Sequence, residues 1–222
     1  LAAYMLADIV GLVVVGSLVD RRGPQMPFVA SIATFVLGLG VAAAANSMIV
    51  LLIGRVLQGA GAGGIAPISY STINRAWPEK LRPRVFAWIS AAWVLPSLVA
   101  PGLAGWATST IGWRWVFIGI VPLALTTAAL AVPSLGRIPR IGANTADDSR
   151  VGLALRLAAG VGAFTTGIQS SHPLLASGLV VVGLALAVPA YNSMTPAGIW
   201  RARRGLPAIL ACRTLATAAF LG

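Results

Sequence analysis

Residues 16–25 read GSLVDRRGPQ and interrupt a sequence that is apolar on both sides. The preceding run, 2–19, contains Asp8 as its only charged side chain. The segment itself brings together one aspartate, two arginines, two glycines and one proline. Glycine and proline end helices and favour turns, and about 20 apolar residues suffice to span a bilayer. The segment therefore indicates the end of a membrane-spanning helix.

The composition of the whole chain is that of an integral membrane protein. Hydrophobic residues make up 58% of the 222 residues and charged residues only 9%, whereas soluble domains carry about 25% charged residues. A net charge of +11 is compatible with nucleic-acid binding, but the basic residues lie between apolar runs and not on one soluble face. We therefore expect the lipid bilayer as a partner and no nucleic acid.

Side chains that could carry covalent or metal chemistry are scarce. The chain has one cysteine, Cys212, and one histidine, His172, so neither a disulfide framework nor a metal cluster is expected. We expect no metal, no cofactor and no enzymatic activity.

Apolar runs divide the rest of the chain at regular intervals. Each run is near the length that crosses about 30 Å of hydrocarbon at about 1.5 Å per residue. All should be helices, because backbone groups in lipid must satisfy their own hydrogen bonds. The predicted fold is therefore all-α, a polytopic membrane helical bundle with about eight transmembrane helices. The runs are 2–19, 27–45, 49–73, 85–108, 115–133, 151–170, 173–191 and 206–222.

The basic residues predict how these helices are oriented. They cluster after the first, third, fifth and seventh runs, whereas Arg114 is the only basic residue after the second, fourth or sixth. Basic loops face the cytoplasm, so the first run passes from outside to inside. The sequence begins with Leu1 and stops inside an apolar run, and we expect it to be a fragment of a longer chain. The clustered residues are Arg21, Arg22, Arg75, Lys80, Arg82, Arg84, Arg137, Arg140, Arg150, Arg201, Arg203 and Arg204.

Four motifs carry a resemblance to one family. Gly16, Asp20, Arg21, Arg22 and Gly23 form the pattern G-x-x-x-D-R-R-G, which resembles the signature loop of the major facilitator superfamily; Pro24 and Gln25 replace two basic residues that the family usually has there. The other three follow in the family's order. They are RVLQGAG at 55–61, similar to the fourth-helix motif; APGLAG at 100–105, similar to the antiporter motif G-P-x-x-G-G of the fifth helix; and WRWVF at 113–117, similar to a junction in drug/proton antiporters.

The resemblance implies a domain organisation with two helix bundles, of which this sequence would contain only a part. Residues 1–132 would form most of the N-terminal bundle without its first helix, and 133–150 a cytoplasmic linker. Residues 151–191 would form the two extra transmembrane helices of the fourteen-helix branch, and 192–222 a cytoplasmic loop and the start of the C-terminal bundle. The remainder of that C-terminal bundle would be a partner within the same chain.

The signature loop is assigned to a gate formed by Gly16, Asp20, Arg21 and Gly23. The small Gly16 permits close helix approach. The resemblance implies that Asp20 pairs with basic groups or a helix N-terminus across the two bundles, and that this contact breaks when the inside opens. The alternative is a solvated turn whose arginines only set the topology.

Proton coupling or the substrate path is assigned to Asp8, Arg55 and Gln58. Asp8 and Arg55 are ionisable residues inside membrane runs, where burial costs about 2.5 kcal/mol or more and a functional role is the default. Each lies about six residues into its run, or about 9 Å below the outer boundary. Equal depth predicts an ion pair if the two helices are neighbours. A static pair, or a hydrated Asp8 near the headgroups, is the alternative.

A conformational switch is assigned to Pro96, Pro101, Gly102 and Gly105 on the fifth-helix motif, with ordinary helix packing as the alternative. Together these assignments predict a secondary transporter of the cell membrane, of bacterial origin, that exports small hydrophobic or cationic molecules in exchange for protons by alternating access. A membrane-embedded enzyme acting on lipid-linked substrates would need clustered acids or histidines, and the five acids are scattered. A truncated, non-transporting copy is the other alternative.

Overall fold

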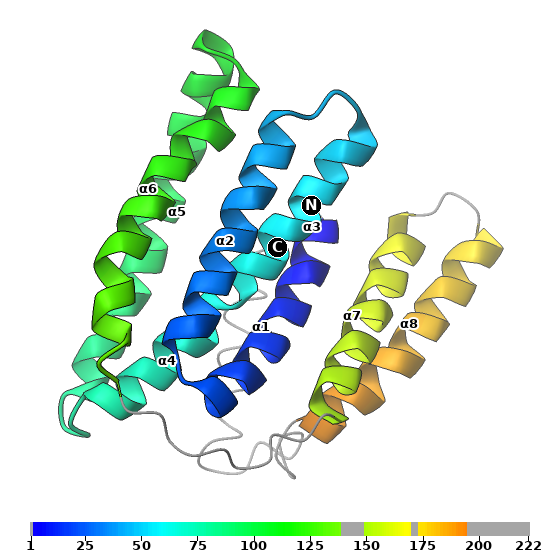
Figure 1. Ribbon diagram of the computed structural model, residues 1–222. Coiled ribbons are helices and arrows are strands. Elements are labelled where there is room, and N and C mark those ends of the chain that lie inside the picture. The colour runs from blue at the N-terminus through cyan, green and yellow to red at the C-terminus, as the bar shows by residue number, and fades with distance from the viewer. Residues whose placement is uncertain (1, 139–148, 170–172, 195–222) are drawn as a thin grey trace. The chain divides into compact units, whose positions relative to one another are not determined.

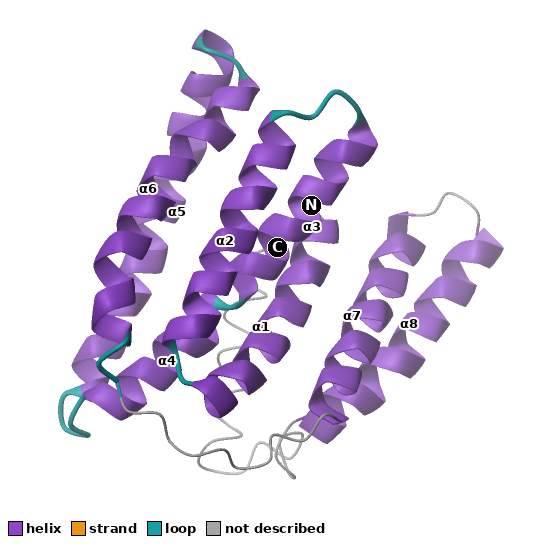
Figure 2. Ribbon diagram, in the orientation of Figure 1, coloured by secondary structure: helices purple, strands orange, loops and turns teal. Residues whose placement is uncertain are grey.

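The computed structural model describes residues 2–138, 149–169 and 173–194, and every regular element in these ranges is a helix (Figure 2). The all-α fold predicted from the sequence is confirmed. Within these ranges, six spans are long and apolar enough to cross a membrane, with α3 and α4 counted as one span. The predicted run 206–222 lies outside the described residues. The helices are α1 Ala2–Arg22, α2 Gln25–Ala43, α3 Met48–Gly63, α4 Ile65–Ala76, α5 Arg82–Thr110, α6 Trp113–Leu135, α7 Ser149–Gln169 and α8 Pro173–Met194.

The chain divides into two compact units, 1–158 and 159–222, with the division inside α7. In the second unit α7 and α8 pack closely through small residues. A Cβ atom placed on Gly160 would lie 2.6 Å from the Ala187 nitrogen, and one placed on Gly183 would lie 2.6 Å from the Phe164 nitrogen. Such approach is typical of membrane helices, where small residues let backbones meet.

In the first unit, α3 packs between α1 and α2 through glycines on two of its faces (Figure 1). Towards α2, a Cβ on Gly54 would lie 2.7 Å from the Ala42 nitrogen, and one on Gly61 would lie 2.5 Å from the Phe35 nitrogen. Towards α1, a Cβ on Gly59 would collide with the Tyr4 carbonyl oxygen. The glycines of the fourth-helix motif are therefore the surface on which three helices meet.

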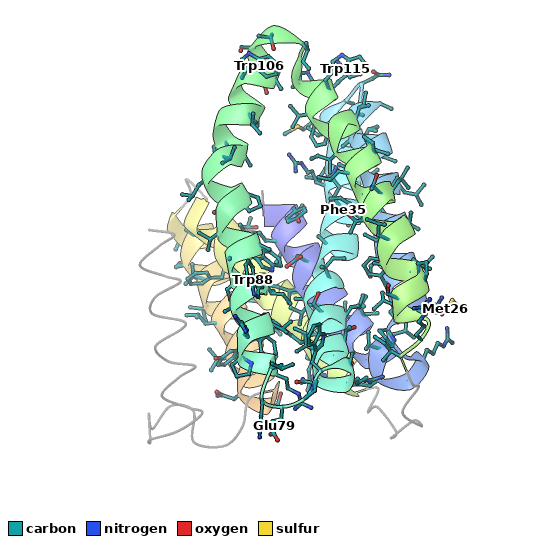
Figure 3. The ribbon with its side chains drawn as sticks, turned by 90° about the vertical axis from the view of Figure 1, so that its left-hand side faces the viewer. Met26, Phe35, Glu79, Trp88, Trp106 and Trp115 are labelled. Carbon is teal, nitrogen blue, oxygen red and sulfur yellow. The ribbon has the colours of Figure 1, made fainter. Side chains whose placement is uncertain are left out.

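Two small apolar clusters fix α6 to this trio. Val19, Phe28, Ile68 and Leu135 join α1, α2, α4 and α6 near one end of the unit. Leu39, Ala42 and Phe117 join α2 to α6 nearer the other end. By contrast, α5 has no buried side chain among its described residues, and it meets α6 mainly near their shared turn (Figure 3).

The turns alternate between the two ends of the first unit. Those after α1 and α4 lie at one end, and those after α2 and α5 lie at the other (Figure 1). Figure 3 shows the same division, with Glu79 and Met26 at one end and Trp106 and Trp115 at the other. The basic clusters after α1 and α4 thus share an end, as the charge pattern predicts; that this end is cytoplasmic stays a prediction.

The third apolar run, 49–73, is bent into two helices. The break falls at Gly64, whose N–H donates to the Gly61 carbonyl at 3.3 Å. Pro67 follows three residues later and has no N–H to donate to the Gly63 carbonyl, so the regular ladder cannot continue. At the segment predicted as a linker, α6 continues to Leu135 and α7 begins at Ser149, so helix covers both of its ends.

Candidate functional site

Arg55, on α3, is held by two contacts inside the first unit. Its Nη1 donates to the Gln58 Oε1 at 3.3 Å, one helical turn further along α3. Its guanidinium carbon lies 5.0 Å from the centre of the Phe117 ring on α6. A cation over an aromatic face within about 6 Å is attracted by the ring quadrupole. The arginine side chain is otherwise exposed, so its charge remains accessible.

Gln58 is the most deeply buried polar residue of this site. Its exposure is 2%, and its Nε2 has no hydrogen-bond partner within the described part of the chain. A buried amide donor without an acceptor is costly. Gln58 therefore offers one unused donor beside the Arg55 guanidinium.

Asp8, on α1, does not form the ion pair with Arg55 that equal depth predicts. No ion pair or hydrogen bond of its carboxylate occurs among the described residues. The Asp8 backbone packs beside Gly63, and Gly63 lies eight residues after Arg55 on α3. Eight residues correspond to about 12 Å along a helix. The prediction of equal depth is wrong, because glycine packing, and not the first residue of each apolar run, sets the stagger of α1 against α3.

Tyr4 occupies the level between these two charges. Its backbone carbonyl packs against Gly59, four residues after Arg55 and four before Gly63. Its side chain lies within electrostatic range of both Asp8 and Arg55. Tyr4, Asp8, Arg55, Gln58 and Phe117, from three helices, are named the α3 cluster below.

The signature loop makes a contact within the first unit. Asp20 Oδ1 lies 3.5 Å from Arg75 Nη2 at the end of α4; the Asp20 side chain is 63% exposed and that of Arg75 is 11% exposed. Arg75 Nη1 is buried without a partner in the described ranges. The pair therefore ties the ends of α1 and α4 together and leaves Asp20 open to further partners.

The glycines of this loop have different environments. Gly23 has a φ of 79°, and its N–H donates to the Val19 carbonyl at 3.0 Å. This left-handed conformation ends α1 and is accessible to glycine at little cost. Gly16 faces Pro67 on α4, and a Cβ there would make ordinary contact at 3.6 Å. Arg21 is exposed in the last turn of α1.

Gln25 has a structural role where the family usually has a basic residue. Its Nε2 donates to the Val132 carbonyl of α6 at 3.5 Å. The same carbonyl accepts the Gly136 N–H at 3.1 Å as α6 ends. Gln25 thus links the beginning of α2 to the end of α6 without adding charge.

The residues assigned to the switch lie on an uncovered helix. Pro96 and Pro101 are inside α5 and exposed. A Cβ on Gly102 or Gly105 would meet no described atom within 4 Å. The described residues therefore do not pack against this face, and the switch role stays a prediction.

Sequence reasoning missed three participants. Arg75 was counted only among the basic loop residues, although its place in the last turn of α4 puts it beside the end of a parallel α1. Phe117 was noted within a motif but not as a partner of Arg55. Tyr4 gave no charge signal, although it lies one turn before Asp8 on the same helix.

Comparison with known proteins agrees with this architecture. The sequence profile of the Major Facilitator Superfamily matches residues 1–222. A multidrug resistance protein B homolog of Mycobacterium tuberculosis is 32% identical over 171 residues, covering 77% of this chain and 31% of that protein. An uncharacterized MFS-type transporter of the same species is 36% identical over 141 residues, which is 62% of this chain and 20% of that protein.

Multidrug export protein EmrB of Haemophilus influenzae is 30% identical over 136 residues, which is 61% of this chain and 27% of that protein. The chain thus spans less than a third of the length of these relatives. Three observations point to the same family: the profile match covers the whole chain, the helices are long and apolar enough to span a membrane, and the motif glycines lie where helices cross. The chain is an integral membrane protein and belongs to the major facilitator superfamily.

Proposed function

We propose that this chain forms one side of a secondary transporter that exports small hydrophobic or cationic molecules in exchange for protons. A second helix bundle would complete the transporter, and the two bundles would rock around a central site. The short coverage of every relative described above supports a longer functional protein. The name of one of those relatives, multidrug export protein EmrB, supports export as its direction.

The observation that carries the proposal is the α3 cluster. Asp8 lies within a membrane span and has no described neutralising partner. A carboxylate is expensive to keep charged in hydrocarbon, whereas the protonated acid is much less so. Tyr4 lies within electrostatic range of both Asp8 and Arg55. Asp8 can therefore take up a proton in one conformation and release it in another, when the position of the Arg55 charge changes.

The Asp20–Arg75 contact supports a gate at the basic end of the bundle. Asp20 keeps one side open to solvent while Arg75 holds the other. In the proposed mechanism a basic group or helix end of the second bundle meets this exposed side when the inside is closed. Separation of the bundles then leaves only the contact with Arg75.

A membrane-embedded enzyme remains the alternative from another class. It would require acids, histidines or cysteines gathered at one place. No group of three such residues occurs within the described ranges. A truncated copy without transport is the second alternative, and it is separated from the proposal only by measurement.

The test uses inverted membrane vesicles that contain the complete transporter and a pH-sensitive acridine dye. Addition of ethidium or tetraphenylphosphonium should release protons from energised vesicles and restore the dye fluorescence. Nigericin, which removes the pH gradient, should abolish uptake of either cation. Equal uptake of both cations by vesicles with and without the protein would contradict the proposal.

A further inference from the structure

The ring of Phe117 is the contact that fixes the Arg55 guanidinium from outside α3. Its centre lies 5.0 Å from the guanidinium carbon. Phe117 itself is only 9% exposed and packs with Leu39 and Ala42 of α2. The hydrogen bond to Gln58 comes from the same helix as Arg55. The aromatic contact therefore joins the position of the arginine to the packing of α6.

The Phe117 ring is anchored in turn from the α5–α6 turn. Trp113 meets it edge to face, with ring centres 6.0 Å apart and planes at 89°. The Arg114 guanidinium lies 4.4 Å from the Trp113 ring centre, and its Nη2 donates to the Ala45 carbonyl at 2.9 Å. Since Ala45 follows the end of α2, these contacts connect the turns at one end of the bundle to Arg55.

The contact between Arg55 and Phe117 determines where the positive charge of Arg55 lies relative to the titratable groups of the α3 cluster. On α1 the titratable groups of the α3 cluster are Tyr4, which lies within electrostatic range of Arg55, and Asp8. The helix α2 carries no titratable residue, and α6 contributes only Arg114, near its beginning. Arginine side chains have several rotatable bonds, and ordering them has an entropic cost. A ring face that accepts the guanidinium selects one position among these rotamers.

We propose that Phe117 is a positioning residue that holds the Arg55 guanidinium beside Gln58, with Trp113 and Arg114 fixing the ring. The effect of Phe117 on transport rests on the proposed proton-coupled function. The position of the Arg55 side chain does not depend on that function. Release of Arg55 from the ring would free its charge to move towards Tyr4 and Asp8, and a positive charge nearer to Asp8 favours loss of the proton. Movement of α6 relative to α3 would thereby change the protonation of Asp8.

A purely apolar role for Phe117 makes a different prediction. Leucine fills a similar space in the cluster of Leu39 and Ala42 but has no ring face for a cation. Phe117→Leu should therefore keep the packing and lose the contact with Arg55, whereas Phe117→Tyr should keep both. The matched control is Phe35→Leu, because Phe35 packs against the same cluster and no cation lies over it among the described residues.

The test measures how fast phenylglyoxal modifies Arg55 in the complete, purified transporter, read by mass spectrometry relative to the exposed Arg84. Phe117→Leu should raise the Arg55 rate about two- to fivefold, as expected for loss of a partly exposed cation–aromatic contact. Phe117→Tyr should match the wild type, and Phe35→Leu should leave the ratio unchanged. Equal ratios in Phe117→Leu and Phe35→Leu would overturn the proposal.

A second measurement separates this inference from the proposed function. The pH profile of ethidium transport should shift in Phe117→Leu, return in Phe117→Tyr and stay unchanged in Phe35→Leu. If the wild type shows no proton-coupled transport while the Arg55 ratio still rises in Phe117→Leu, the function is wrong and the positioning stands. If the ratio does not rise, the positioning is wrong whatever the transport result. Each variant must elute as a folded monodisperse species before it is compared.

Discussion

At the scale of single residues, the contact between Asp20 and Arg75 contributes little to the free energy of unfolding, but it lies where it can affect the gate. The two side chains differ widely in exposure, 63% and 11%. Ion pairs with an exposed partner contribute about 1 kcal/mol or less. The pair is therefore too weak to hold the fold, but it is placed where the ends of α1 and α4 must stay together.

Removal of either charge should impair transport without preventing insertion. Asp20→Asn and Arg75→Gln are each expected to lower the transport rate while membrane content stays near wild type. The double variant should be little worse than either single variant, because one contact is lost in all three. Arg22→Gln, an exposed arginine of the same turn, is the control for loss of charge alone. Normal transport by Asp20→Asn would remove the gate from the account.

At the scale of elements, the glycines of α3 should matter in proportion to what faces them. Gly61→Ala would force a methyl group to within 2.5 Å of the α2 backbone at Phe35, whereas Gly40→Ala on α2 meets no described atom within 4 Å. Overpacking of this kind costs about 1–3 kcal/mol. Gly61→Ala should therefore lower the thermal unfolding temperature in detergent, and Gly40→Ala should not. Equal unfolding temperatures would contradict the helix crossing.

The open face of α5 gives the opposite expectation. Gly102→Ala and Gly105→Ala add methyl groups where the described chain has no atom within 4 Å. Neither change should lower the unfolding temperature of a fragment 1–138. In the complete transporter they should slow transport if the second bundle packs against this face. Unchanged transport in both variants would leave α5 as an ordinary packing helix.

The helices themselves could be predicted because the bilayer leaves few choices. Within the described residues each apolar run corresponds to one helix, except that the run 49–73 is divided into α3 and α4 at Gly64. The stagger of α1 against α3 could not be predicted. The stagger depends on how Gly59 and Gly63 fit against the backbone of Tyr4 and Asp8. The position of an apolar run in the sequence does not indicate which helical turns of two helices will be in contact. The contact of Phe117 with Arg55 was hidden for the same reason.

At the scale of the whole molecule, the arrangement of turns predicts how the chain crosses the bilayer. The basic turns after α1 and α4 share one end of the first unit (Figure 1). Single cysteines in a Cys212→Ala background should be labelled from outside at position 47 but not at 22 or 80. External labelling at position 80 by an impermeant maleimide would overturn this orientation.

The α3 cluster is proposed to link protons to transport, and Asp8 is the only carboxylate of this cluster. The most direct measurement compares ethidium transport from pH 5.5 to 8.5 by the wild type, Asp8→Asn and the control Glu79→Gln, an exposed acid in the turn before α5. Asp8→Asn should transport with little pH dependence and should no longer release protons, while Glu79→Gln should follow the wild type. An unchanged pH profile and unchanged proton release in Asp8→Asn would contradict the proposed link.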